Sequence, residues 1–501
     1  MTGANNPIEP QAVEPQRRSM DSLVWEVREA VMRQKESHPD LTGAETYLSP
    51  ADWRELNERR AELGQDLFTK AKELQGMPLL PTDPATSEDT PAMSMPQEET
   101  PVHLQHPMRI DVYHSTYEPF VLSMTPSGVA GQLPSPDDGW RAAVAAYHRA
   151  LEEKGIGGRR GFRFLRPLGQ GGQGKVFLCR CPGADGFSRI VALKLFSPEA
   201  YPTLASYQQA MRRIARVVTR VSAVSHDHVV DVQRFLKRDE IRIMLMERIE
   251  GFDLRRLLQP KMLQRFRDRA SDEDWRKTNQ IVVTAGPEQA RLLPGAAVTI
   301  VRDCLAGLRT LHCMGIIHGD IRPANLMVQP DGSIKIIDLG SVVVQGDAPR
   351  ERVFTPAYAA PEVLESKPWL PQSDLASLGY VLLELLTGRH LFAPSQSIEQ
   401  LLEAKRALPD RVPQLLPAPL HRSGRLVAFC QRLIAPDPQH RFSSAEQADV
   451  DPEYGAYAFH QELARGKLDA VWKHDVSIWQ KYLRPAKRSS RTASRCAKAT
   501  S

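Results

Sequence analysis

Two carboxylates and an amide stand close together near the middle of the chain, where they could act on one substrate. Asp320 and Asn325 lie in a polar segment between apolar runs, and Asp338 follows the next strand-like run. One carboxylate can accept the proton of a hydroxyl group, while the amide and the second carboxylate offer the oxygen ligands that Mg²⁺ prefers. These groups suit phosphoryl transfer. The structural alternative is a pair of ordinary Asp-containing turns.

A glycine-rich segment and a lysine precede these groups in an order that suits a nucleotide. The segment GQGGQGKV places Gly169, Gly171 and Gly174 between two strand-like runs, where the backbone could approach a polyphosphate and direct N–H groups at its oxygens. Lys194 ends the apolar run VALK. Each feature alone is weak, because glycine-rich hairpins are common and a lysine can extend from a strand end into water. In combination with the carboxylates and the amide, a chance assembly is improbable.

The elements that would position these residues fall into two unlike parts. Short strand-like runs surround one helical segment, 201–223, between residues 162 and 249. Helical patterns dominate from residue 254 to about 463. A small β-rich lobe followed by a larger helical lobe would enclose a cleft, which is a usual place for a small-molecule site.

Together the motifs resemble the protein kinase domain, of the eukaryotic-like Ser/Thr type found in bacteria. The resemblance covers about residues 162–463 and implies an α+β, bilobal protein kinase-like fold, with a small β-rich N-lobe (162–249) and a larger helical C-lobe (250–463). Thr355–Glu362 is similar to the end of a kinase activation segment, and Asp374–Gly379 to the start of the central helix of the large lobe. Arg441 is similar to the arginine that pairs with the glutamate at position 362.

The resemblance implies ATP and Mg²⁺ as cofactors and a protein Ser or Thr hydroxyl as acceptor. Asp320 is similar to the catalytic base, Lys194 to the lysine that holds the α and β phosphates, and Arg322 stands where such kinases usually carry lysine. Asn325 and Asp338 are similar to the Mg²⁺ ligands. The residues implied around the nucleotide, from the glycine-rich loop, the purine slot, the hinge and the ribose contact, are Leu168, Gly169, Gly171, Gly174, Val176, Ala192, Lys194, Glu247, Ile249, Asp253 and Met327.

Two features of the activation segment bear on acceptor choice and control. Thr355 is similar to the threonine that bridges the catalytic base and the substrate loop in Ser/Thr enzymes. Gly319 stands where many kinases carry an arginine that meets an activation-segment phosphate. We therefore expect no dependence on that phosphate, and neutral drift at an unused position is the alternative reading.

The helix after Lys194 and an insert also differ from the usual protein kinase pattern. Active kinases pair that lysine with a glutamate on the following helix, but no Asp or Glu occurs from Tyr201 through His226. Gln208, Gln209 or a carboxylate from elsewhere could replace it. The charge-mixed insert 259–293 is expected to be a solvated excursion, with a docking role as the minority hypothesis.

These departures keep two other function classes open. A pseudokinase, acting as a nucleotide-binding or scaffolding module, is favoured by the missing helix glutamate and opposed by the retained Lys194, Asp320, Asn325 and Asp338. A small-molecule phosphotransferase is disfavoured by the segment at 355–362, which resembles a protein-substrate loop.

The flanking segments differ from the kinase-like region in composition. Residues 1–137 are proline-rich and expected to be largely disordered, apart from possible docking helices at Asp21–Gln34 and Pro50–Gln75. A lead-in helix is expected within 138–161, and further helices packed on the large lobe run through 454–483, of which 464–483 is a C-terminal helical extension. Residues 484–501 are expected to form a basic, disordered tail.

Composition and charge narrow the class of protein, its expected partners and its expected location. The 501 residues are 42% hydrophobic and 25% charged, which excludes a wholly disordered chain, a collagen-like chain and a small disulfide scaffold. Six basic residues of the tail account for the formal net charge of +5, because the rest of the chain sums to −1. There is therefore no strong indication of a nucleic-acid partner. The absence of a signal peptide or membrane span, and six scattered cysteines, favour a cytoplasmic protein with free thiols. Cys179 and Cys181 are better explained as strand residues than as metal ligands.

Overall fold

The computed structural model describes eight stretches of the chain, all within the compact unit formed by residues 104–501. They are residues 120–123, 138–158, 161–223, 225–346, 351–393, 396–418, 420–465 and 472–484. The docking helices expected at 21–34 and 50–75 and the tail beyond Arg484 lie outside the described residues.

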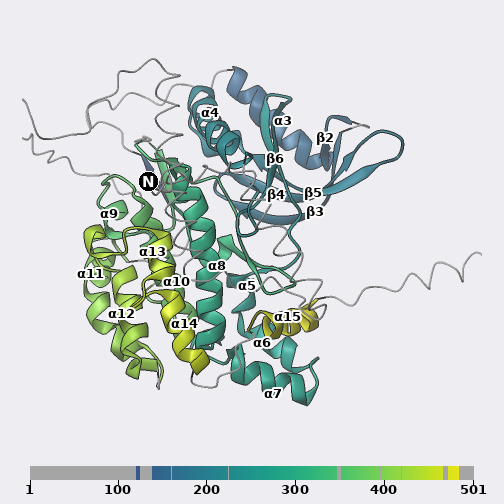
Figure 1. Ribbon diagram of the computed structural model, residues 1–501. Helices are drawn as coiled ribbons and strands as arrows, with labels where there is room; N and C mark the ends of the chain where they lie inside the picture. The colour runs from purple at the N-terminus through teal and green to yellow at the C-terminus, as the bar shows by residue number, and fades with distance from the viewer. Residues whose placement is uncertain are drawn as a thin grey trace, which may run out of the picture. The chain divides into compact units, whose positions relative to one another are not determined.

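The smaller lobe is an antiparallel sheet of six strands in the order β2-β3-β4-β5-β7-β6, flanked by α3 and α4 (Figure 1). Helix α4 begins at a capping box in which Thr203 and Ser206 bond each other's backbone N–H groups. Its buried face packs with β5 and β7 residues in one apolar cluster. The elements are β2 (Gly155–Ile156), β3 (Phe162–Gly171), β4 (Gly174–Pro182), β5 (Ser188–Phe196), β6 (Val232–Arg238), β7 (Ile241–Met246), α3 (Asp138–Glu152), α4 (Leu204–Val221) and the short η2 (Pro198–Ala200).

The larger lobe is helical and is built around α8 and α10, whose residues are mostly buried (Figure 1). This arrangement confirms the expected bilobal α+β fold. None of the helices in the described ranges combines the length and apolar character needed to cross a membrane. The helices are α5 (Leu254–Leu257), α6 (Pro260–Arg267), α7 (Asp272–Ile281), α8 (Pro294–Cys313), α9 (Pro361–Leu364), α10 (Pro371–Thr387), α11 (Ile398–Leu415), α12 (Gly424–Leu433), α13 (Ala445–Val450), α14 (Ala456–Arg465) and α15 (Trp472–Leu483), with η3 (Pro323–Asn325), η4 (Leu420–Arg422) and η5 (Pro438–His440).

Four small sheets in this lobe fix the loops that carry the polar motifs. Asp320 lies in the loop between β11 and β12, and Asp338 follows β13. Strand β15 leads directly into Thr355 and pairs with β1, a strand of the N-terminal extension. The pairs are β11 (Ile316–Ile317) with β14 (Val343–Val344), β9 (Val283–Thr284) with β10 (Arg291–Leu292), β1 (Phe120–Ser123) with β15 (Glu351–Phe354), and β12 (Leu326–Val328) between β13 (Ile334–Ile336) and β8 (Phe252–Asp253).

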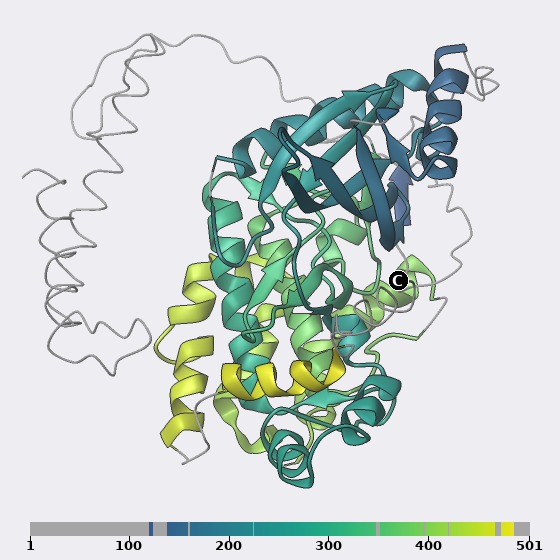
Figure 2. The same cartoon turned by 90° about the vertical axis from the view of Figure 1, so that its right-hand side faces the viewer.

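The insert at 259–293 is not the solvated excursion that its charge suggested. Helix α6 buries Met262, Leu263 and Phe266, and the β9–β10 hairpin buries Val283 and Leu292. Helix α15, yellow in Figure 2, packs against both α6 and α7. The expectation was wrong because the residues that cover these apolar side chains lie about 200 positions later, near Trp479, where no local pattern can show them.

Candidate active site

The carboxylate of Asp320 is held by side chains on both of its oxygens. Oδ1 accepts hydrogen bonds from the backbone N–H (3.1 Å) and the hydroxyl (2.8 Å) of Thr355, as expected for a bridging threonine. Oδ2 accepts one from the amide of Asn325 at 3.0 Å, and Nε of Arg322 lies 3.1 Å away as an ion pair. Asp320 is buried apart from 7% of its surface, so its acceptor atoms are presented in one fixed direction.

Asp374, at the start of α10, positions the loop that carries Asp320. Its two oxygens accept the backbone N–H groups of His318 and Gly319, each at 2.8 Å, and the ring of His312 at 2.8 Å. Its side chain is fully buried. The sequence had marked Asp374 only as a helix start, and nothing in its neighbourhood showed that its carboxylate reaches a loop more than fifty residues earlier.

Gly319 is required by packing. Its backbone has φ +75°, a left-handed conformation that favours glycine. A Cβ atom at this position would lie 2.0 Å from the ring of Trp369. With Trp369 in its present position, an arginine therefore has no room at position 319.

Lys194 and Asp338 face each other across the two lobes. The Nζ atom of Lys194 lies 2.5 Å from Oδ1 of Asp338, which also accepts the backbone N–H of Gly340 at 3.1 Å. Burial opposes ionisation of the Asp338 carboxyl, but Lys194 and the N–H of Gly340 outweigh it, so the pKa of Asp338 lies below its usual value. Asp338 is therefore a carboxylate at neutral pH, and it lies directly opposite the side chain of Lys194.

The side chain that assists Lys194 comes from the glycine-rich loop. Gln173 is buried, its Oε1 accepts from Lys194 Nζ at 3.4 Å, and its Nε2 donates to the carbonyl oxygen of Gly340 at 3.1 Å. Its backbone oxygen accepts from Ser197 at 2.9 Å, just past the end of β5. Within the described part of the chain, the hydrogen bonds of Lys194 Nζ go to Asp338 and Gln173.

Helix α4 does not supply a polar partner for Lys194. Its buried face is apolar, with Tyr207, Met211 and Ile214 directed into the lobe. Gln208 is half-buried and Gln209 is exposed, and no hydrogen bond joins either to Lys194 among the described residues. From the sequence, the partner that replaces the missing helix glutamate was expected on this helix. The only sequence feature that pointed to Gln173 is that it is a large polar residue among glycines.

The residues expected around a purine come together only in part. Val176, Ala192 and Ile249 pack in one apolar cluster of the small lobe, while Leu168 is 43% exposed. Gly174 has φ +141°, and a Cβ there would lie 2.0 Å from the carbonyl oxygen of Leu195, so only glycine fits. Gly169 and Gly171 end strand β3 with open space beside them.

The hinge and ribose candidates also hold the structure together. Glu247 accepts from Lys335 at 2.6 Å and from the backbone N–H of Asp231 at 2.8 Å, so its side chain ties the hinge to the large lobe. Asp253 caps α5 by accepting from the N–H of Arg256 at 2.9 Å, and it pairs in register with Met327 of β12. Asp253 of the large lobe and Leu168 of the small lobe line the same hollow.

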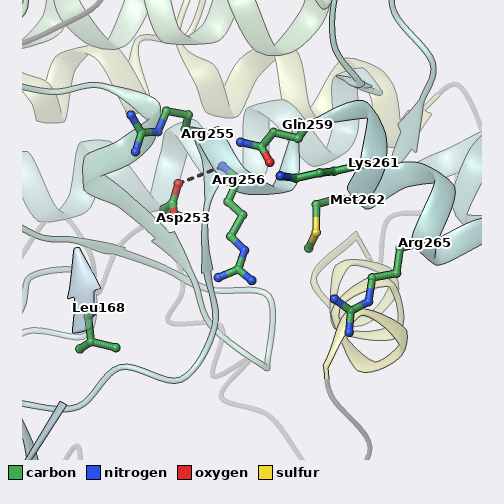
Figure 3. A pocket seen from close by; sticks show the side chains of 8 residues that line it. All are labelled: Leu168, Asp253, Arg255, Arg256, Gln259, Lys261, Met262 and Arg265. Atoms are coloured by element: carbon green, nitrogen blue, oxygen red, sulfur yellow. Dashed lines mark hydrogen bonds between the residues drawn. The ribbon is translucent and has the colours of Figure 1, made fainter. Parts of the chain in front are cut away.

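The hollow that Leu168 and Asp253 line is basic and has a volume of about 510 Å³ (Figure 3). Arg256, Lys261 and Arg265 extend toward it from α5 and α6, and the single acid in its lining, Asp253, is already engaged as a helix cap. No ion pair joins these three cations to a carboxylate within the described ranges. The hollow lies beside the loop that carries Asp320 and Asn325, because α5 packs against η3. Its full lining is Leu168, Asp253, Arg255, Arg256, Gln259, Lys261, Met262 and Arg265.

The donor set at Asn325 and Asp338 fits a magnesium ion that phosphates help to hold. The described residues contain no cluster of three or more His, Cys, Asp or Glu side chains able to bind a metal. Mg²⁺ is usually held by one or two carboxylates together with phosphate oxygens and water, so two protein oxygens suffice. Asn325 donates its amide N–H to the Asp320 carbonyl oxygen at 2.8 Å, which reserves its amide oxygen for a cation.

Comparison with known proteins identifies the fold family. The sequence model of the protein kinase domain matches residues 162–451, more than half of the chain. Serine/threonine-protein kinase PrkC of Bacillus subtilis is 25% identical over 302 residues, which are 60% of this chain and 40% of that protein. Serine/threonine-protein kinase PkaA of Streptomyces coelicolor is 28% identical over 270 residues (51% and 44%). Serine/threonine-protein kinase PknD of Mycobacterium tuberculosis is 29% identical over 292 residues (57% and 38%).

The matched regions span less than half of each of these relatives. Within the region matched here lie Lys194, Asp320, Asn325 and Asp338, and the architectural pair Glu362–Arg441 closes at 2.7 and 2.8 Å. With this match and the bilobal fold, the chain belongs to the protein kinase family.

Proposed function

We propose that the protein is a serine/threonine protein kinase, which transfers the γ-phosphate of ATP to Ser or Thr hydroxyls of a protein. The observation that carries the proposal is the Asp320 carboxylate, bonded to Thr355 on one oxygen and to Asn325 on the other. A threonine in that place links the base to the segment that would receive a protein acceptor. The family membership and the names of the bacterial relatives support the same reaction.

The chain's residues would divide the work of transfer among them. The acceptor oxygen forms a bond to the γ-phosphorus while the bond from that phosphorus to the bridging oxygen of ADP breaks, and the hydroxyl proton passes to Asp320. Lys194 and Arg322 offset the negative charge of the phosphoryl oxygens. Asn325 and Asp338 would hold Mg²⁺, which when bound neutralises phosphate charge.

Purified protein incubated with labelled ATP and Mg²⁺, alone and with a generic protein acceptor, tests this function. We expect incorporation of label into Ser or Thr of the acceptor. A thermal shift with ATP but no transfer to any acceptor would favour the pseudokinase. Transfer to small molecules only would favour a small-molecule phosphotransferase. We further propose a cytoplasmic location, which the free thiols of the five described cysteines support.

Gln173→Ala is expected to weaken ATP binding about fivefold, because Lys194 loses the acceptor that helps hold its ammonium group, a loss of about 1 kcal/mol. Fluorescence titration with a labelled ATP analogue measures the effect. Gln170→Ala, an exposed glutamine in the same loop, is the matched control and should bind as the parent protein does. Tighter binding by Gln173→Ala would mean that Gln173 obstructs the phosphates instead of positioning Lys194.

The basic hollow is expected to favour acidic acceptors. In Arg256→Glu/Lys261→Glu, both changes fall on exposed side chains, and the KM for a peptide with Asp or Glu near the acceptor Ser should rise about tenfold. The KM for an uncharged peptide should stay the same. Arg212→Glu/Arg216→Glu, on the exposed side of α4, makes the same charge change elsewhere. Equal losses for both peptides, or for both double variants, would contradict acceptor recognition by the hollow.

A further inference from the structure

The activation segment has no fully exposed hydroxyl that could act as a phosphate switch. Between Asp338 and Glu362 the only Ser, Thr or Tyr residues are Ser341, Thr355 and Tyr358. Thr355 is 1% exposed and bonded to Asp320, and Tyr358 is 7% exposed and donates to Glu384 at 2.6 Å. Ser341 is half-buried and lies at the far end, directly after Gly340. With Gly319 in place of a phosphate-binding arginine, something other than a phosphate must hold the segment.

Both ends of this segment are fixed by contacts within the large lobe. At its start, β14 pairs with β11 beside the catalytic loop. At its end, Lys405 donates to the carbonyl oxygen of Ala357 at 2.7 Å, and Glu362 pairs with Arg441. The stretch just before Thr355 is held differently.

Strand β15, immediately before Thr355, forms a two-stranded sheet with β1. The antiparallel register joins Phe120 to Phe354, Val121 to Val353, Leu122 to Arg352 and Ser123 to Glu351. No other strand of the described chain pairs with β15. The ladder ends one residue before Thr355, whose N–H and hydroxyl both bind Asp320, so the backbone that β1 fixes continues directly into the contact with the catalytic base.

We propose that β1, supplied by the N-terminal extension, is a positioning segment that holds Thr355 against Asp320 and takes the place of an activation-segment phosphate. This inference rests on the proposed kinase function. Main-chain pairing suits the role, because adding a strand fixes a neighbouring backbone whatever its side chains are. Losing one or two such hydrogen bonds would release the segment from β1 for part of the time.

The double variant Val121→Pro/Leu122→Pro tests the pairing in the full chain, since proline removes the N–H groups of two adjacent residues and one of them faces β15. We expect kcat/KM for a protein acceptor to fall about tenfold, the change that corresponds to one or two net hydrogen bonds. ATP affinity should change less than twofold. The control Val121→Thr/Leu122→Thr keeps the backbone donors and strand propensity and should keep full activity.

Hydrogen exchange and a peptide added in trans separate this proposal from the proposed function. The amides of Val353 to Thr355 should exchange faster in the proline variant, whether or not the protein transfers phosphate. A synthetic peptide of residues 117–126 should restore their protection and the lost activity. Unchanged amide exchange in the proline variant would overturn the proposal. Higher activity of that variant would also overturn it, because β1 would then be an inhibitor of the kinase. If the parent protein shows no transfer at all, only the proposed function fails, and the exchange result still decides whether β1 orders the segment.

Discussion

Asp338→Asn is expected to reduce phosphate transfer by about 10³-fold or more while the domain stays folded. The amide can still accept from Gly340 and Lys194, whose atoms lie 3.1 and 2.5 Å from Oδ1, but it lacks the charge that holds a cation beside the phosphates. Asp320→Ala should be equally inactive, because it removes the proton acceptor. Rates with labelled ATP, together with thermal unfolding, check both variants.

The matched control for these variants is Asp185→Asn, which changes an exposed carboxylate in a turn of the small lobe. It should transfer phosphate at the parent rate. Near-normal incorporation by Asp338→Asn or Asp320→Ala would rule out the proposed mechanism. Loss of activity accompanied by loss of the thermal transition would show only that the variant failed to fold.

Breaking the buried pair of Glu362 and Arg441 should give the largest change in stability. The two side chains form a bidentate pair at 2.7 and 2.8 Å, and both are almost fully buried. Arg441 also donates to three backbone carbonyls, and Ser373 donates to Glu362 at 2.6 Å. Glu362→Ala would leave a buried guanidinium without its counter-charge, so the free energy of unfolding should fall by about 3–5 kcal/mol.

Urea denaturation of Glu362→Ala and Arg425→Ala measures this difference. Arg425 pairs with Glu462 at 3.2 Å on the partly exposed surface, so its loss should cost no more than about 1 kcal/mol. Similar losses in the two variants would mean that the buried pair has no special structural role.

How far the sequence could predict this site depends on the distance between its parts. Asp320, Asn325 and Asp338 were predicted because each sits in a short motif whose residue types are set by local chemistry. Thr355 and Arg441 were found through a family resemblance, and both make the expected contacts at 2.8 and 2.7 Å. Lys194 was expected to hold the nucleotide phosphates, which stays a prediction. Its contact with Asp338 was not anticipated, and the partner that replaces the helix glutamate was sought on α4 and not in the glycine-rich loop.

The parts that escaped prediction all depend on contacts between distant segments. Gln173 donates a hydrogen bond to Gly340, which lies 167 positions later in the sequence. The ring of Trp369 leaves no space for a side chain at position 319, and no sequence motif indicated that contact. The insert was judged by its charge, although α15 covers its apolar side. Strand β1 lies in a proline-rich stretch that was expected to be largely disordered, and its partner strand supplies the order that its own composition does not.

The position of α15 has a consequence for the order in which the protein is made. Trp479 and Leu483 are buried in the large-lobe core, Lys277 pairs with Asp475 at 3.0 Å, and Arg269 donates to the carbonyl oxygens of Tyr482 and Arg484. Helices α6 and α7 are synthesised roughly 200 residues before the helix that covers them. The apolar residues of α6 that pack against α15 therefore cannot be covered by it until α15 has left the ribosome, so this part of the large-lobe core forms last.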